Sequence, residues 1–114
     1  MALDALETTE VIEVMENFIN EKRPPKELRK KLDLSYRIEK QSIYIYEIRP
    51  MWDNPSQVHN YEMAKATYVK NKDIWKVFWL RGNLKWSPYN PPTVKTLKEF
   101  VDLVIEDKYC CFWG

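Results

Sequence analysis

The hydrophobic pattern predicts a helix near each end of the chain. From about residue 8 to residue 21, apolar side chains recur every three or four positions opposite acidic and polar ones, as in an amphipathic helix. Pro24 and Pro25 predict its end, because proline lacks the amide proton that a helix needs. Near the other end, Thr96 and Glu99 have capping-box spacing and apolar residues follow at helical spacing. We therefore expect two amphipathic helices.

Between these segments, apolar and polar residues alternate as they do in β-strands. The strands predicted from this alternation cover about residues 32–39, 42–49, 62–70, 74–81 and 84–86. Residues 42–49 are apolar at alternate positions on both faces, which places this strand in the middle of a sheet. Residues 51–60 lose the period and contain several turn formers, so we expect a loop there. The predicted fold class is α+β, with an antiparallel sheet of four to five strands and the two helices.

The chain length and the net charge are compatible with many functions. A chain of 114 residues fits one domain, residues 1–114, and its formal net charge of +1 creates no field that would draw nucleic acid. Apolar runs are far shorter than the ~20 residues of a membrane span, and the N-terminus lacks the pattern of a secretory signal. We expect a cytoplasmic protein without a membrane segment. Cys110 and Cys111 are adjacent, so we interpret them as thiols rather than as a disulfide.

The common catalytic and cofactor motifs are missing from the sequence. Gly82 and Gly114 are the only glycines, so there is no glycine-rich phosphate loop. His59 is the only histidine, which leaves a histidine-based metal site or catalytic triad short of partners. We therefore predict no catalytic residue, no metal and no cofactor.

Charged residues stand beside tryptophans at the ends of two predicted strands. Glu47 and Arg49 are two positions apart, so both point to one face of their strand, with Cα atoms about 6.6 to 7 Å apart. Arg81 ends the strand at 74–81, and Lys85 lies in the next one. The candidate binding site comprises Glu47, Arg49, Trp52, Arg81, Lys85 and Trp86.

Three interpretations of this candidate site stay open. The charges can form an ion-pair network that closes the end of the sheet. Alternatively, Arg49, Arg81 and Lys85 can bind an anion, with Trp52 or Trp86 as a stacking wall. In the third interpretation, Glu47 is the acid or base of an enzyme or of a small-ligand site.

The order of several short segments resembles a bacterial family, domain of unknown function 3024. These segments are RPP at 23–25, EIRPMWD at 47–53, AKATYV at 64–69, IWKVFWLRGNLKWSPY at 74–89 and EDKYCCFWG at 106–114. The family pattern is similar at Glu47, Arg49, Trp52, Arg81, Lys85, Trp86, Tyr89, Asp107 and Gly114. A glycine that often precedes the final cysteine in the family is Cys110 here. The resemblance implies no established activity.

The aromatic content favours an interaction module over an enzyme. Five tryptophans and seven tyrosines are more than a small two-layer core can hide, and exposed aromatics are typical of protein interfaces. We expect a non-enzymatic binding module whose partner is a protein or a second copy of the chain, as in a homodimer. An anion or another small ligand is the alternative. Single-stranded nucleic acid is a third option, which the near-neutral charge and the lack of an RNP-type motif disfavour.

Overall fold

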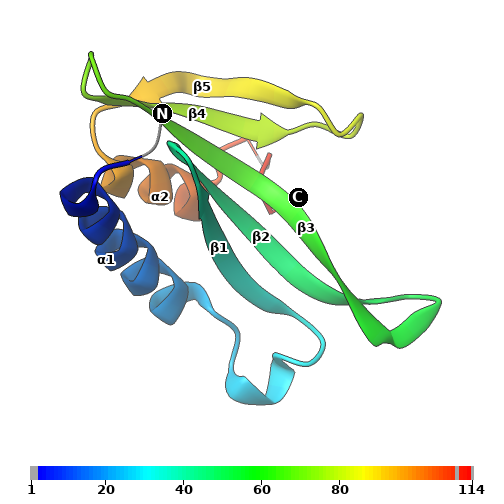
Figure 1. Ribbon diagram of the computed structural model, residues 1–114. Coiled ribbons are helices and arrows are strands. Elements are labelled where there is room, and N and C mark those ends of the chain that lie inside the picture. The colour runs from blue at the N-terminus through cyan, green and yellow to red at the C-terminus, as the bar shows by residue number, and fades with distance from the viewer. Residues whose placement is uncertain (1–2, 110, 114) are drawn as a thin grey trace.

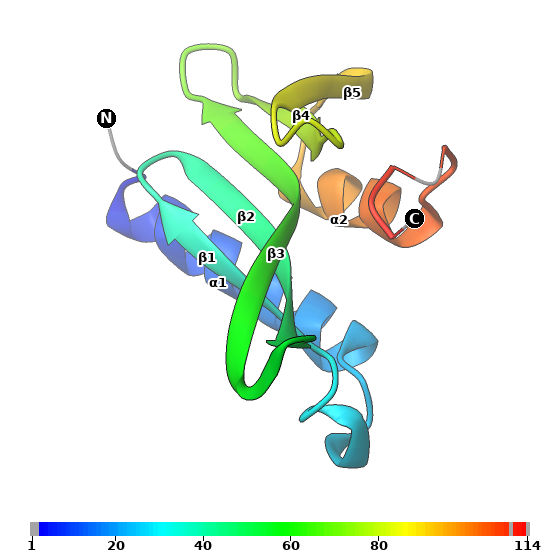
Figure 2. The ribbon, with the colours of Figure 1, turned by 90° about the vertical axis from the view of Figure 1, so that its right-hand side faces the viewer.

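A five-stranded antiparallel sheet carries both long helices on the same face (Figures 1 and 2). The computed structural model describes residues 3–109 and 111–113. Its elements are α1 (Ala5–Lys22), the short 3-10 helix η1 (Lys26–Leu28), β1 (Asp33–Glu39), β2 (Ser42–Met51), β3 (Asn54–Val69), β4 (Ile74–Leu80), β5 (Trp86–Val94) and α2 (Leu97–Glu106). The strands lie in the sheet in chain order, β1 to β5. The predicted α+β fold with two terminal helices is confirmed.

Capping side chains set the bounds of both helices. Asp4 accepts a hydrogen bond from the backbone N–H of Glu7 at 2.8 Å, and the Glu7 carboxylate accepts one from the Asp4 N–H at 3.0 Å. This capping box starts α1 three residues earlier than its apolar period predicts. At α2, the Thr96 hydroxyl accepts a hydrogen bond from the Glu99 N–H at 3.2 Å, as the sequence predicted.

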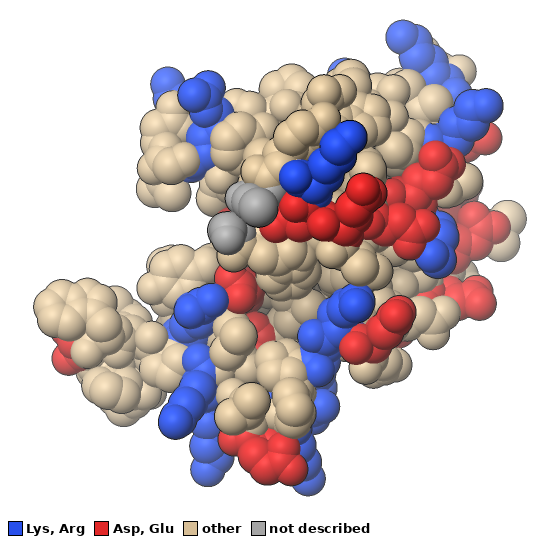
Figure 3. Space-filling view, turned by 180° about the vertical axis from the view of Figure 1, so that it is seen from behind, with Lys and Arg blue, Asp and Glu red and all other residues tan. Residues whose placement is uncertain are grey.

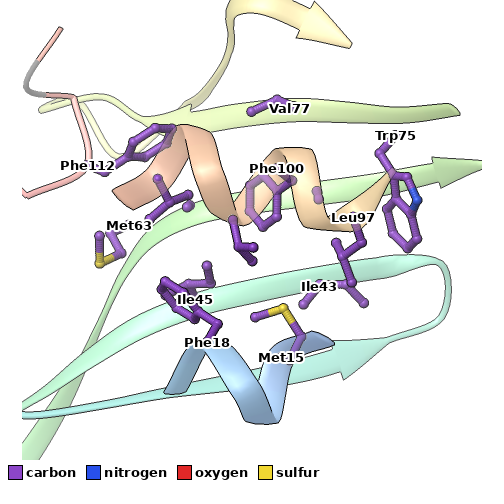
Figure 4. Close-up of a cluster of buried hydrophobic side chains, with 14 of the residues drawn as sticks. Met15, Phe18, Ile43, Ile45, Met63, Trp75, Val77, Leu97, Phe100 and Phe112 are labelled. Carbon is purple, nitrogen blue, oxygen red and sulfur yellow. The ribbon is translucent and has the colours of Figure 1, made fainter. Parts of the chain in front are cut away.

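The core lies between the two helices and one face of the sheet (Figure 4). Met15 of α1 and Phe100 of α2 are fully buried against Ile43, Ile45 and Val77 of the sheet. Ile43 and Ile45 occupy alternate positions of β2, so both point to one face of the sheet. Val77 of β4 points to the same face. The intervening side chains of both strands point to the other face, which neither helix covers.

The predicted loop at 51–60 is wrong, because most of this segment is strand. β2 and β3 stay paired to Met51 and Asn54, with shifts of register after Ile45 and after Pro50. Only Trp52 and Asp53 separate the two strands. Residues 54–61 are all exposed. A strand with neither face buried needs no hydrophobic alternation, so its sequence lacks the period by which strands are recognised.

The fifth strand, predicted at 84–86, begins later and is longer than predicted, since residues 84 and 85 lie in the turn before it. β5 runs to Val94 and includes Pro88, Pro91 and Pro92, where the sequence indicated a stop. β5 is at the edge of the sheet, next to β4 alone. An edge strand accepts proline more readily than a central strand, because one side of its backbone has no neighbouring strand to bond.

The C-terminal tail packs onto the body, as the sequence predicted. Phe112 is buried, and the indole N–H of Trp113 donates to the backbone carbonyl of Val104 at 2.7 Å. Cys111 is half-buried. Cys110 and Gly114, which the sequence analysis also singled out, lie outside the described residues.

Candidate functional site

The hairpin of β2 and β3 extends beyond the rest of the sheet as a two-stranded arm, residues 49–61. In the described chain, β1 pairs with β2 only as far as Ile48, and β4 pairs with β3 only from Ala64 onward. Both neighbours therefore end before the arm does. Figure 3 shows the arm projecting from the body at the left, and the molecule reaches 45 Å along its longest axis.

Large apolar side chains line this arm in contact with solvent. Trp52 at the tip is 93% exposed, Val58 is 61% exposed and Tyr61 is 46% exposed. Burying one tryptophan removes on the order of 150 to 250 Å² from water, so leaving Trp52 in solvent forgoes a large stabilisation. The tip is thus the most costly exposed apolar position in the described chain.

Glu47 and Arg49 lie at the base of the arm and form an ion pair. The Arg49 guanidinium is 3.1 Å from the Glu47 carboxylate, and its side chain is 51% exposed, whereas that of Glu47 is 17% exposed. Arg49 is in register with His59 of β3, whose ring packs on that of Tyr61 at 4.6 Å. The two predicted charges therefore face each other, and the pair is solvated on the arginine side.

Arg81 and Lys85 lie on a separate hairpin, the turn between β4 and β5. The backbone N–H of Arg81 donates to the Lys85 carbonyl at 3.0 Å, and the Arg81 guanidinium carbon is 6.0 Å from the centre of the Trp79 ring. Neither residue takes part in an ion pair of the described chain, which leaves Glu47 and Arg49 as an isolated pair. The ion-pair network that the sequence suggested between these two strand ends does not form there.

Trp86, the last of the predicted residues, belongs to the uncovered face of the sheet. Its ring meets the edge of Tyr44 at 5.8 Å. The candidate residues are thus at one end of the sheet, since β2 and β4 run in the same direction, but they occupy the arm, the β4–β5 turn and the uncovered face. Sequence reasoning did not single out their neighbours Tyr44, Lys65 and Phe78. The alternation of tyrosines with isoleucines in β2 already indicated an aromatic face opposite the core.

Two clefts lie at the opposite end of the sheet from Glu47. One of about 490 Å³ is bounded by α1, the start of α2 and Trp75, and one of about 540 Å³ lies beside residues 68–71. Tyr68 borders both, and its hydroxyl donates to Asp73 at 2.7 Å. This hydrogen bond raises the pKa of Tyr68 to about 12. A role for Glu47 as an acid or base requires a pocket at the end of the sheet where Glu47 itself lies.

The residues that the structure describes contain neither a metal-binding cluster of side chains nor a membrane-spanning helix. No three His, Cys, Asp or Glu side chains among residues 3–109 and 111–113 are grouped to hold a metal ion. No helix in the same residues has the length and apolarity needed to cross a bilayer.

Two further positions of the family pattern hold the C-terminal tail. Tyr89 is buried with its ring 4.7 Å from that of Phe112. Asp107 ends α2 in a left-handed conformation, and its carboxylate accepts the backbone N–H groups of Phe112 and Trp113. These two positions of the pattern stabilise the fold.

Comparison with known proteins identifies the family. No curated protein and no solved structure matches the chain. The model of one family, described as Domain of unknown function (DUF3024), matches residues 3–114 and so spans nearly the whole chain. The ordered segments that suggested this resemblance run through the arm, the β4–β5 hairpin and the tail. The chain belongs to the DUF3024 family.

Proposed function

We propose that this protein is a non-enzymatic interaction module and that the arm binds a protein partner, which we take to be a second copy of the chain. The observation that carries the proposal is the nearly complete exposure of Trp52 at the tip of a projecting hairpin. Tryptophan is enriched among the residues that dominate binding energy at protein interfaces. The proposal includes the bacterial, cytoplasmic setting that the sequence led us to expect.

The open edge of β3 supports strand pairing as the binding mode. No strand of the described chain pairs with residues 54–61 on the side of β4. Natural proteins protect such edges with lysines and other charges, which prevent pairing with another chain. Residues 54–61 contain no Lys, Arg, Asp or Glu, and Pro55 near the tip is their only proline. The edge therefore lacks the charged residues that would block pairing.

A second copy is the partner that this edge fits best. Two identical strands related by a two-fold axis perpendicular to them run antiparallel, so each presents its backbone donors and acceptors to the matching groups of the other. Like charges opposite each other would oppose such pairing, and residues 54–61 have none. At the base of the arm, Glu47 and Arg49 already neutralise each other. Self-association would also cover Trp52 and Val58.

Sedimentation equilibrium over a wide concentration range tests the proposal. We expect a concentration-dependent dimer and, for Trp52→Ala, at least about 10-fold weaker association, because truncating a central interface tryptophan commonly costs about 2 kcal/mol or more. Val58→Lys places a charge on the edge and should also favour the monomer. Leu28→Lys is the matched control, since Leu28 is 50% exposed on η1, outside the arm. A chain that stays monomeric at every concentration would exclude the second copy.

A further inference from the structure

The face of the sheet opposite the helices presents a row of cationic and aromatic side chains. Arg37, Tyr44, Lys65 and Phe78 are consecutive cross-strand partners on β1, β2, β3 and β4. Trp86 of β5 joins this row through its edge contact with Tyr44 at 5.8 Å. All five side chains are half-buried, so part of each remains in contact with solvent. We call these five residues the platform.

Lys65 lies at the centre of the platform among three rings. Its Nζ is 5.3 Å from the ring centre of Phe78, 5.4 Å from that of Tyr44 and 5.8 Å from that of Trp86. These distances are within the range of cation–π attraction, which holds the ammonium group over the rings without a carboxylate. No ion pair of the described residues includes Lys65, so its charge remains uncompensated.

The two acids of this face, Glu39 and Glu62, share one arginine. Arg37 stacks on Tyr44, with its guanidinium carbon 3.9 Å from the ring centre, and binds Glu62 at 2.7 Å as well as Glu39. Lys76, exposed on the same face, is like Lys65 in no ion pair of the described chain. Arg37, Glu39 and Glu62 together carry a charge of −1 and Lys65 and Lys76 add +2, so the net charge of these residues is +1.

We infer that the platform binds single-stranded nucleic acid, with bases stacked on Phe78 and Trp86 and phosphates beside Lys65 and Lys76. Each nucleotide of a single strand supplies a flat base and one negative charge. Bases stack on aromatic rings, and phosphates bind lysines that have no carboxylate partner. A duplex keeps its bases stacked inside and cannot reach the rings. Because the chain is nearly neutral overall, the attraction is local and should involve only two or three phosphates.

Fluorescence anisotropy of labelled 15-nucleotide oligo-dT and oligo-U tests this inference. We expect binding of at least one of the two at 50 mM salt and roughly 10-fold weaker binding at 200 mM, because two or three phosphate contacts on a single strand give a shallow salt dependence. A duplex of the same length should compete poorly. Absence of binding to both oligonucleotides at 50 mM salt would overturn the inference.

Substitutions on the platform separate stacking from charge. Trp86→Ala should weaken binding about 10-fold at either salt concentration, since one base loses its stacking partner. Lys65→Gln should lower the magnitude of the salt slope by about 0.7, the contribution of one phosphate contact on a single strand. Lys26→Gln on η1 is the matched control for the charge, because Lys26 is exposed away from the sheet. If both platform variants bind like the unmodified chain, the platform is not the site.

Two further variants keep the test independent of folding and of the proposed self-association. Phe78→Leu retains an apolar residue on the face and should weaken binding even if Trp86→Ala fails to fold. Trp52→Ala at the tip of the arm should leave oligonucleotide binding unchanged while it weakens self-association. Conversely, Trp86→Ala should bind oligonucleotide poorly and still associate, so either proposal can fail without the other.

Discussion

The backbone N–H of Phe112 donates a hydrogen bond of 3.0 Å to the Asp107 carboxylate, which ties the C-terminal tail to the end of α2. The other oxygen of the same carboxylate accepts from Trp113 at 2.9 Å. Asp107 has φ 45°, a left-handed conformation that aspartate, asparagine and glycine adopt more readily than other residues. The Asp107 backbone thus ends α2, and its side chain holds the tail that follows.

Replacing Asp107 should separate these two contributions. Asp107→Ala loses both hydrogen bonds and keeps a β-carbon in the left-handed region without a carboxylate to stabilise the turn, so we expect the free energy of unfolding to fall by about 2 to 3 kcal/mol. Asp107→Gly loses the same bonds without the backbone strain and should cost about 1 kcal/mol less than alanine. Urea unfolding of both variants measures the difference. Equal losses would show that the conformation contributes nothing.

Truncating Arg49 should have little effect on stability. Its ion pair with Glu47 is solvated on the arginine side, and pairs of this kind are worth about 0 to 1 kcal/mol. We expect Arg49→Ala to lower the free energy of unfolding by less than about 1 kcal/mol in urea titrations. A loss of about 3 kcal/mol or more would mean that Glu47 is left without compensation, as in a buried pair.

The ion pair between Arg23 and Asp33 should make stability depend on acid pH. The bidentate hydrogen bond from Arg23 lowers the pKa of Asp33 below its usual 3.8, so the unfolded chain binds more protons just below that pH. The stabilisation is present above about pH 4 and is lost as the pH falls through the lowered pKa. Urea unfolding between pH 2 and pH 7 should show this loss in the unmodified chain. Asp33→Asn should remove it and Arg23→Gln should reduce it, because the Leu34 N–H also bonds the Asp33 carboxylate. A variant with the original acid dependence would contradict the assignment.

Tyr68 should contribute to a loss of stability at alkaline pH. Its hydrogen bond to Asp73 raises its pKa to about 12, whereas an unfolded tyrosine titrates near 10. Between these values the folded chain holds more protons, so stability falls as the pH rises through this window. Tyr68→Phe should reduce the decline in the free energy of unfolding from pH 9 to pH 11. Burial also raises the pKa of Tyr36 to about 12. Part of the alkaline loss of stability should therefore remain in Tyr68→Phe.

Local signals in the sequence were enough to locate both helices and most strands. Thr96 with Glu99 marked the start of α2, and alternation in β2 separated Ile43 and Ile45 from Tyr44. Such signals act between near neighbours, through caps and through the burial of one face. They failed for residues 54–61 because no face of the arm is buried. They failed for β5 because proline is excluded from central strands but not from an edge.

The amino-acid sequence by itself determined the α+β class, the family pattern and the residue types that gather at one end of the sheet. Only the tertiary structure decided how those residues are divided. Arg49 and Trp52 lie on the arm and Glu47 lies at its base. Arg81 and Lys85 lie on the β4–β5 turn, and Trp86 lies on the platform. Alternation shows that a strand has two faces, but which face the helices cover depends on contacts between residues far apart in the chain. The exposure of the arm and of the platform is therefore a property of the fold.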